Sequence, residues 1–168
     1  QPSYATLINN TVAFNGGDTG RTGQGLYVRG GSQVTSTNDL FWNNGEDDVF
    51  ARANEGANIT LEHSSFLATT LDGLDQLSGN LSSDPLFVGA DDYRVTEGSP
   101  MVNAGGVPPS SVGADFRCIA RSQGGSADIG AFELAVTSNT PESDCQLPVD
   151  APPPEDPIGG GGGEGPGG

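Results

Sequence analysis

The first half of the chain repeats itself, and this constrains the fold more than any other feature. Three pairs of segments align, at offsets of 29, 23 and 25 residues: 9–16 with 38–45, 26–29 with 49–52, and 34–38 with 59–63. Short β-rich pieces between Gly and Asn turns, repeated at such a period, are typical of a β-solenoid. One coil of a solenoid cannot bury its inner face alone, so we expect successive coils to stack on one another.

Apolar and polar residues alternate within these pieces, as they do in strands. We expect the apolar residues to point inward and to stack on their equivalents in the next coil: Leu26 and Val28 on Val49 and Ala51, Val34 on Ile59, and Val12 on Phe41 and Phe66. Turn residues recur as well, with Asn9, Asn38 and His63 at one repeat position and Asn15 and Asn44 at another. Asn tolerates left-handed backbone geometry, so these positions are expected at the corners.

Composition narrows the class of protein. The 168 residues are 33% hydrophobic and include 27 Gly and 12 Pro, which disfavours helices. The net charge of −16 argues against binding to nucleic acid or to an anionic membrane surface. The sequence contains no apolar run long enough to span a membrane, so we expect no membrane insertion by this chain.

The second half carries a set of motifs in a specific order. They are Gly79-Asn80-Leu81, residues 84–88, residues 92–95, residues 98–105, residues 113–117 and finally Asp128-Ile129-Gly130-Ala131-Phe132-Glu133. In order and spacing, this part resembles the closing segment of bacterial right-handed parallel β-helix surface proteins with a choice-of-anchor Q type C-terminal domain, which have a pectin-lyase-like fold. The resemblance covers about a third of the chain. It implies a location outside the cell or on the bacterial cell surface.

We therefore expect an all-β chain that forms a right-handed parallel β-helix of about three rungs, with an irregular C-terminal cap and a disordered Gly/Pro-rich tail. The rungs would occupy residues 1–78, the capping or anchor-type segment residues 79–147, and the stalk residues 148–168. We expect the cap to cover the open bottom of the solenoid, where unpaired strand edges invite aggregation.

Three further local expectations concern the second half. Residues 71–77 are expected to be an irregular or short helical connection. Residues 86–88 and 93–95 are predicted to be short strands, and residues 128–136 a last strand.

The two cysteines, Cys118 and Cys145, lie near the end of the predicted folded part. Together with a single His they cannot build a zinc site. A disulfide between them, which would join the C-terminal extension to the end of the β-helix, is favoured over two unrelated buried thiols. Such a bond would indicate an oxidising, extracytoplasmic compartment.

β-Helix folds include polysaccharide lyases and hydrolases, and each of these enzyme classes needs a characteristic set of residues. A lyase needs clustered carboxylates that hold Ca²⁺ near a basic residue, and a hydrolase needs paired carboxylates. Glu46, Asp47 and Asp48 form the densest acidic cluster near a rung, and Asp18 lies in the corresponding longer loop of the previous rung. These residues are a candidate Ca²⁺ site, although Asp is also common in turns.

No His, Lys or second Asp recurs at the rung offsets, so we expect no catalytic residues in this chain. The two acidic residues of the closing motif, Asp128 and Glu133, would lie on opposite faces of a strand. We expect a structural pairing of one of them with Arg117 or Arg121 rather than a role in acid–base catalysis.

A binding face is the better functional candidate. If the flanking apolar residues point inward, Tyr27 and Phe50 point outward as one stacked pair, and Arg29 and Arg52 as another. Aromatic faces stack on sugar rings, and Arg binds carboxylates or sulfates with two hydrogen bonds. The alternative is that the two Arg are solvated and paired with neighbours such as Glu55.

Three functions follow from these features. The leading hypothesis is a non-enzymatic, exported or cell-surface β-helix module for adhesion or glycan contact, with a surface polysaccharide as its partner. The second is the C-terminal part of a polysaccharide lyase or hydrolase. The third is a structural subunit that stacks end-to-end on copies of itself into fibres.

Overall fold

A computed structural model describes residues 1–16 and 24–135 of the chain. In that part the protein is all-β, because it consists of short strands with two single-turn 3₁₀ helices between them. The elements are β1 (Tyr4–Ile8), β2 (Thr11–Ala13), β3 (Leu26–Val28), β4 (Gln33–Thr37), β5 (Leu40–Trp42), β6 (Val49–Ala51), η1 (Ala53–Glu55), β7 (Asn58–Glu62), β8 (Leu74–Gln76), β9 (Phe87–Gly89), β10 (Asp92–Val95) and η2 (Ser110–Val112). Neither described helix has the length and hydropathy that crossing a membrane requires.

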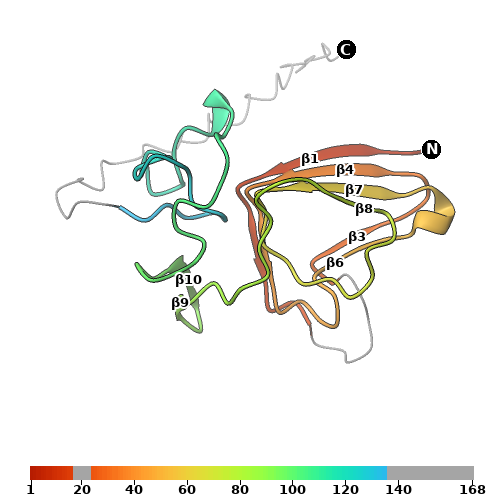
Figure 1. Cartoon of the computed structure of the whole chain (residues 1–168), viewed down its shortest axis with the longest axis horizontal. Helices are drawn as coiled ribbons and strands as arrows, with labels where there is room; N and C mark the ends of the chain where they lie inside the picture. Colours follow the sequence, from red (N-terminus) through yellow and green to blue (C-terminus); the bar gives the residue numbers. More distant parts are fainter. Residues whose placement is uncertain (17–23, 136–168) are drawn as a thin grey trace, which may run out of the picture.

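The first eight strands form three parallel sheets. Their orders are β1-β4-β7-β8, β2-β5 and β3-β6, so from β1 to β7 the chain leaves each sheet and returns to it after the other two, whereas β8 follows β7 in the same sheet (Figure 1). The registers confirm the three repeat offsets, because Val12 pairs with Phe41, Leu26 with Val49, and Val34 with Ile59.

The main hydrophobic core lies between these parallel sheets. Its buried members are Val28, Val34, Phe41, Val49, Ala51, Ala57, Ile59, Leu61, Phe66 and Leu74. This set confirms the inward facing expected for most of these residues, and Val12 and Leu26, which are partly buried, pack against it. Ile59 and Leu61 are completely buried, because β7 has a neighbouring strand on both sides.

Left-handed residues mark two corners where the chain passes between sheets. Asn9, Asn38 and His63 have φ values of 54°, 58° and 46°, as the repeat predicts. At the second corner, however, Phe14 and Asn43 hold the positive φ values, and the predicted residues Asn15 and Asn44 follow them. Asn44 acts there through its side chain, whose Oδ1 accepts the backbone N–H of Asn15 at 3.1 Å.

A ladder of polar side chains connects successive turns of the chain beside the first corner. The backbone N–H of Asn10 donates to Asp39 Oδ1 at 2.7 Å, that of Asp39 to Ser64 Oγ at 3.1 Å, and that of Ser64 to Asn80 Oδ1 at 2.9 Å. Each side chain thus accepts the N–H group of the equivalent residue one turn earlier. Buried backbone donors require such partners, and the ladder supplies them where no sheet continues.

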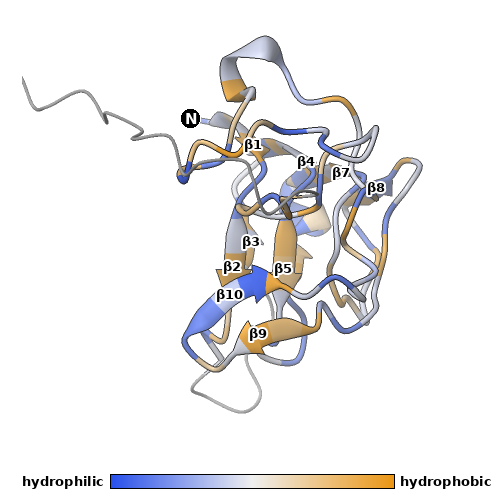
Figure 2. Cartoon of the chain, turned by 90° about the vertical axis from the view of Figure 1, so that its left-hand side faces the viewer, coloured by the Kyte–Doolittle hydropathy of each residue, from blue (hydrophilic) through white to orange (hydrophobic). Residues whose placement is uncertain are grey.

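The segment after β8 packs against the side of the parallel sheets (Figure 2). A second core forms there, in which the outward-facing Leu40 of β5 contacts Val95, Met101 and Ile129 of the C-terminal segment. The expectation that this segment covers the open bottom is therefore wrong. The reason is that Leu40 and Trp42 make the outer face of β5 apolar, and the segment buries that face instead.

The local expectations for the second half have mixed outcomes. The two short predicted strands exist as the antiparallel pair β9 and β10. Residues 71–77 contain β8, which extends the large sheet by pairing with β7, so the expected irregular connection is wrong. Residues 129–131 form a bend and residues 132–135 are irregular, so the last strand predicted for 128–136 is absent from the described residues, because Gly130 adopts a φ of 107° and breaks the extended path.

Candidate functional site

An aromatic pair lies on the outer face of the sheet formed by β3 and β6. Tyr27 and Phe50 are the middle residues of these strands and are direct partners in the register. Their neighbours Val28, Val49 and Ala51 are buried in the core, so the alternation of the strands directs both rings outward. The ring centroids are 5.7 Å apart and the planes differ by 12°.

The guanidinium of Arg52 covers one side of this pair. Its Cζ lies 5.9 Å from the centroid of the Tyr27 ring, within the range of cation–π attraction. Its Nη1 donates to Glu55 Oε1 at 2.8 Å, and Glu55 Oε2 accepts the backbone N–H of Gly30 at 3.0 Å. The hydrogen bond between the two side chains raises the pKa of Arg52 and lowers the pKa of Glu55.

Arg29 is the remaining residue of the group. Its exposed side chain lies close enough to Glu55 for its charge to contribute to the lowered pKa of that carboxyl, after the larger effect of Arg52. Arg52 is thus paired with Glu55, as the alternative to an outward-facing Arg pair predicts. Arg29, Arg52 and Glu55 together carry one net positive charge on a chain of charge −16.

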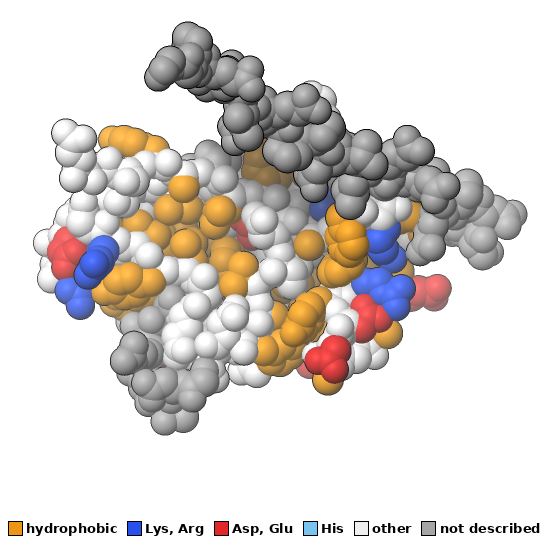
Figure 3. Space-filling view, turned by 180° about the vertical axis from the view of Figure 1, so that it is seen from behind, with side chains coloured by type: hydrophobic (Ala, Val, Ile, Leu, Met, Phe, Trp, Pro, Cys, Tyr) orange, Lys and Arg blue, Asp and Glu red, His pale blue; other side chains and the backbone are white. Residues whose placement is uncertain are grey.

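This arrangement suits contact with a sugar. Tyr27 is 42% exposed, so part of its ring surface is open to solvent beside Phe50 and Arg52. Rings of this kind stack on the C–H faces of pyranoses, while guanidinium groups donate to hydroxyls and carboxylates. In Figure 3 charged groups of both signs lie beside hydrophobic side chains at the left and again at the right of the molecule. We refer to Tyr27, Arg29, Phe50, Arg52 and Glu55 as the aromatic face.

The candidate Ca²⁺ residues have structural partners. Asp48 Oδ1 accepts the backbone N–H of Asn44 at 2.8 Å, and its Oδ2 accepts that of Leu67 at 2.8 Å. Asp47 Oδ1 accepts the N–H of Thr69, whereas its buried Oδ2 has no hydrogen-bond partner among the described residues. Asp18 lies outside the described residues.

Within residues 1–16 and 24–135, no group of three or more His, Cys, Asp or Glu side chains is placed to hold a metal ion. The contacts of Asp47 and Asp48 instead tie the turn before β6 to the next turn of the chain. Their buried carboxylates satisfy backbone donors of residues 67–69, which belong to no strand.

Buried charges gather in the C-terminal segment. Glu133 Oε2 accepts the N–H of Asp128 at 3.0 Å and lies 3.7 Å from Nη1 of Arg121. Arg117 pairs with Asp115 at 3.0 Å and donates to the backbone C=O of Glu133 at 2.7 Å. The pairing of Glu133 with Arg121 confirms the structural role expected for the closing motif.

The expectation that Asp128 and Glu133 lie on opposite faces of a strand is wrong, because no strand forms over these residues. The bend at Gly130 brings the two carboxyls into one buried cluster. Burial is the main cause of the raised pKa of Asp128 and of Glu133, and their mutual repulsion adds to the rise for Glu133. Burial also lowers the pKa of Arg121. All four carboxylate oxygens have backbone or guanidinium partners, so the cluster organises loops rather than a substrate.

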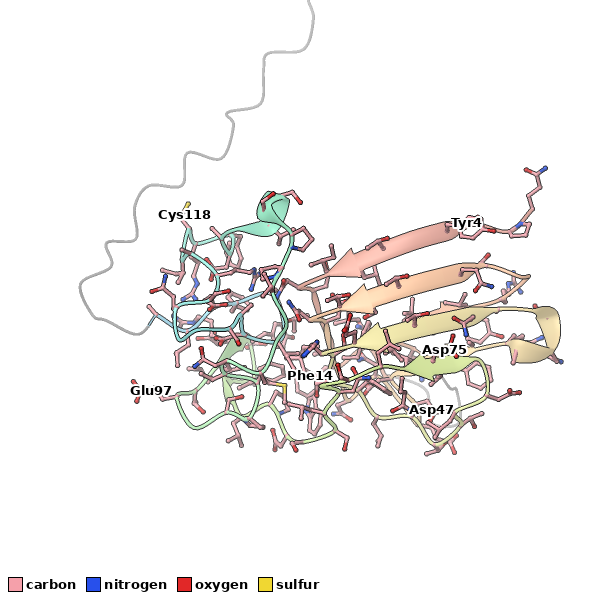
Figure 4. The ribbon with its side chains drawn as sticks, turned by 45° about the horizontal axis from the view of Figure 1, so that its top comes forward. Tyr4, Phe14, Asp47, Asp75, Glu97 and Cys118 are labelled. Carbon is pink, nitrogen blue, oxygen red and sulfur yellow. The ribbon has the colours of Figure 1, made fainter. Side chains whose placement is uncertain are left out.

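Cys118 lies in the C-terminal segment, away from the parallel sheets (Figure 4), and is disulfide-bonded. Cys145, its predicted partner, is outside the described residues, as is the predicted stalk over residues 148–168.

Comparisons with models of known families, with curated proteins and with solved structures find no match for this chain.

Proposed function

We propose that the chain folds as a right-handed parallel β-helix of about three rungs. Three parallel sheets support this, because the chain returns to each of them at offsets of 23 to 29 residues. The stacked apolar residues between the sheets and the polar ladder at the corner are what a solenoid requires to join neighbouring coils.

The proposed function is non-enzymatic contact with a glycan, by a module exported to the cell surface or beyond. The stacked pair of Tyr27 and Phe50 carries this proposal, since two rings on a rigid sheet form a platform of the size of a sugar ring. The carboxylates that could act as catalytic acid or base or as Ca²⁺ ligands, such as those of Asp48 and Glu133, instead accept hydrogen bonds from backbone N–H groups. The disulfide at Cys118 fits an oxidising, extracytoplasmic location, as does the resemblance to anchor-type β-helix surface proteins.

A binding panel tests this function. The full chain would be titrated with neutral, uronic-acid and sulfated oligosaccharides, and binding would be measured by calorimetry. For any oligosaccharide that binds, Tyr27→Ala and Phe50→Ala should each weaken the affinity at least about tenfold, as loss of a central aromatic contact does. Phe116→Ala is the matched control, because Phe116 is a 64% exposed aromatic residue of the C-terminal segment, where it contacts Phe132 and not Tyr27 or Phe50.

Arg29 allows the sign of the ligand charge to be tested. Arg29 and Arg52 are both exposed, but within residues 1–16 and 24–135 it is Arg52 that is hydrogen-bonded to Glu55. Arg29→Gln should therefore weaken binding of anionic oligosaccharides more than that of neutral ones. Binding that is unchanged in Tyr27→Ala and Phe50→Ala would overturn the assignment of the aromatic face.

A further inference from the structure

The dipeptide Asn-Gly occurs twice in the sequence, as Asn15-Gly16 and as Asn44-Gly45, at an offset of 29 residues. The same offset relates β2 to β5, so the two dipeptides occupy equivalent positions at the second corner. Phe14, directly before the first dipeptide, is labelled in Figure 4. Because the two local sequences are the same, any difference in their chemistry must come from their surroundings.

An Asn-Gly dipeptide is reactive in water. The backbone nitrogen of the Gly attacks Cγ of the Asn side chain and forms a C–N bond, while the side-chain nitrogen takes up the proton of the Gly amide and leaves as ammonia. The product is a five-membered succinimide ring. Water then opens the ring at one of its two carbonyls, which leaves either Asp or isoaspartate. Gly favours the attack because it has no Cβ that would shield its nitrogen.

Packing at the corner requires the first of these glycines. A Cβ on Gly16 would lie 2.6 Å from the backbone nitrogen of Gly45 and 3.0 Å from its Cα. Real Cβ atoms do not approach backbone that closely, so a larger residue at position 16 would push the two turns of the chain apart. The fold therefore places a reactive dipeptide at this corner.

Asn15 is open to the reaction. Both Asn15 and Gly16 are exposed to solvent, so water reaches the side-chain amide and the attacking nitrogen. Within the part of the chain that the structure describes, the Asn15 amide makes a single hydrogen bond, from Nδ2 to Asn44 Oδ1 at 3.0 Å. Rotation of this side chain toward the Gly16 nitrogen therefore breaks little structure.

Asn44 is held in the opposite situation. It is completely buried. Its Nδ2 donates to the C=O of Val12 at 2.8 Å and to Asp48 Oδ1 at 3.1 Å, and its Oδ1 accepts the backbone N–H and the Nδ2 of Asn15. Attack at Cγ would take the side chain out of these four hydrogen bonds and leave buried partners without one, which is costly. Burial also keeps away the water that would open the ring.

We propose that Asn15 is a site of spontaneous covalent modification in the folded protein, at which Gly16 and water convert the side-chain amide to a carboxylate, while Asn44 is protected. Burial and the four hydrogen bonds of Asn44 account for the selectivity, because the two dipeptides are otherwise the same.

The modification changes the corner. The Nδ2 of Asn15 donates to Asn44 Oδ1, and an ionised carboxylate has no proton to donate. Two acceptor oxygens then face each other where a hydrogen bond was. In the isoaspartate product the main chain also passes through Cβ, which lengthens the backbone next to the N–H group that bonds to Asn44. We therefore expect modified molecules to unfold at a lower denaturant concentration than unmodified ones, and to separate from them on an anion-exchange column.

The test follows the two sites in one sample. The full chain would be incubated at mildly alkaline pH, and portions would be denatured and digested with trypsin over time. Cleavage after Arg21, Arg29 and Arg52 places the two dipeptides in separate peptides, 1–21 and 30–52. Fragment-ion mass spectrometry then locates each conversion. We expect Asn15 to convert at least about tenfold faster than Asn44, because the reaction at Asn44 must first break its buried hydrogen bonds.

Two controls separate the fold from the sequence. In concentrated urea the two sites should convert at similar rates, since the surroundings that distinguish them are lost. In water enriched in ¹⁸O the converted residue 15 should gain one ¹⁸O atom, as opening of the ring by solvent requires. Asn15→Gln should abolish conversion at position 15, because the longer side chain would have to close a less favourable six-membered ring.

The other outcomes overturn the proposal. Similar rates at Asn15 and Asn44 in the folded chain would show that burial does not protect Asn44. Conversion of Asn15 in urea but not in the folded chain would show that the fold holds the Gly16 nitrogen away from Cγ. Absence of conversion at both sites under both conditions would show that the dipeptides do not react.

Discussion

Asn38 and Gly106 are joined by two hydrogen bonds, although 68 residues separate them. The Oδ1 of Asn38 accepts the N–H of Gly106 at 2.7 Å, and its Nδ2 donates to the C=O of Gly106 at 3.0 Å. Asn38 is completely buried and has a φ of 58°. One residue therefore both turns the corner of the parallel sheets and holds the C-terminal segment against it.

Replacing Asn38 should destabilise the protein markedly. In Asn38→Ala both backbone groups of Gly106 lose their partner in a partly buried site, and residue 38 itself is strained at positive φ. We expect a loss of about 2–4 kcal/mol of unfolding free energy, measured by chemical denaturation. The exposed Asn15→Ala loses one side-chain hydrogen bond and should cost less than about 1 kcal/mol. Equal losses in the two variants would contradict the role of Asn38.

Substitutions at two glycines allow the cost of backbone strain to be measured separately from the cost of close packing. Gly125 and Gly130 both have a φ of 107°, so Ala costs about 1–3 kcal/mol of strain at either site. A Cβ on Gly130 would also lie 2.8 Å from Thr11 Oγ1 and 3.3 Å from Leu40 Cβ, whereas one on Gly125 would meet nothing within 4 Å. Denaturation should therefore show Gly130→Ala to be less stable than Gly125→Ala by about 1–3 kcal/mol. Matching values would mean that the segment does not pack tightly on β2 and β5.

Leu40 tests the second core. Its side chain is 1% exposed and contacts Val95, Met101 and Ile129. Leu40→Ala should cost about 2–5 kcal/mol, as in an ordinary core. Leu67 is 50% exposed, so Leu67→Ala should change the stability by no more than about 0.5 kcal/mol. A cost for Leu40→Ala close to that of Leu67→Ala would show that the C-terminal segment is not held on β5.

The buried carboxyls predict how stability depends on pH. Burial raises the pKa of Asp128 and of Glu133 above the ordinary values of 3.8 and 4.5. The folded protein therefore holds these protons more tightly than the unfolded chain does. Their stabilising contribution is complete below the ordinary values and is lost as the pH rises through the raised ones.

Glu133→Gln removes one of these groups. Its unfolding free energy should fall less steeply than that of the unmodified chain as the pH rises above 4.5, even if its absolute stability is lower. Asp92 is the control, because its pKa shift has the opposite sign: its hydrogen bond with Arg94 lowers its pKa to about 2. Asp92→Asn should alter the pH dependence only below pH 3.8, where the contribution of Asp92 is lost. Parallel curves for Glu133→Gln and the unmodified chain would contradict the assigned shift.

The repeat in the sequence was sufficient to predict the sheets. Stacking of Val34 on Ile59, and of Leu26 on Val49, depends on local alternation and on a constant offset, and both are visible in one sequence. The same alternation predicted that Tyr27 and Phe50 would meet, because strand partners on one face are fixed by the register.

Contacts between distant, irregular segments could not be predicted in this way. Nothing in the sequence near Gly106 or Gly130 indicates that Asn38 and Leu40 are their partners. The strand β8 was missed because its partner β7 determines its conformation, not its own short and polar sequence. The outward-facing Leu40 and Trp42 were the available signal, since two apolar residues on the outside of a sheet require a cover.

The central claim is that the aromatic face binds sugars, and an NMR titration tests it most directly. Aromatic ¹H–¹³C spectra would be followed while the best oligosaccharide from the binding panel is added. We expect saturable shifts of the Tyr27 and Phe50 signals, with the Phe116 and Tyr4 signals unmoved. Shifts confined to other residues, or no saturable shift with any oligosaccharide, would contradict the account.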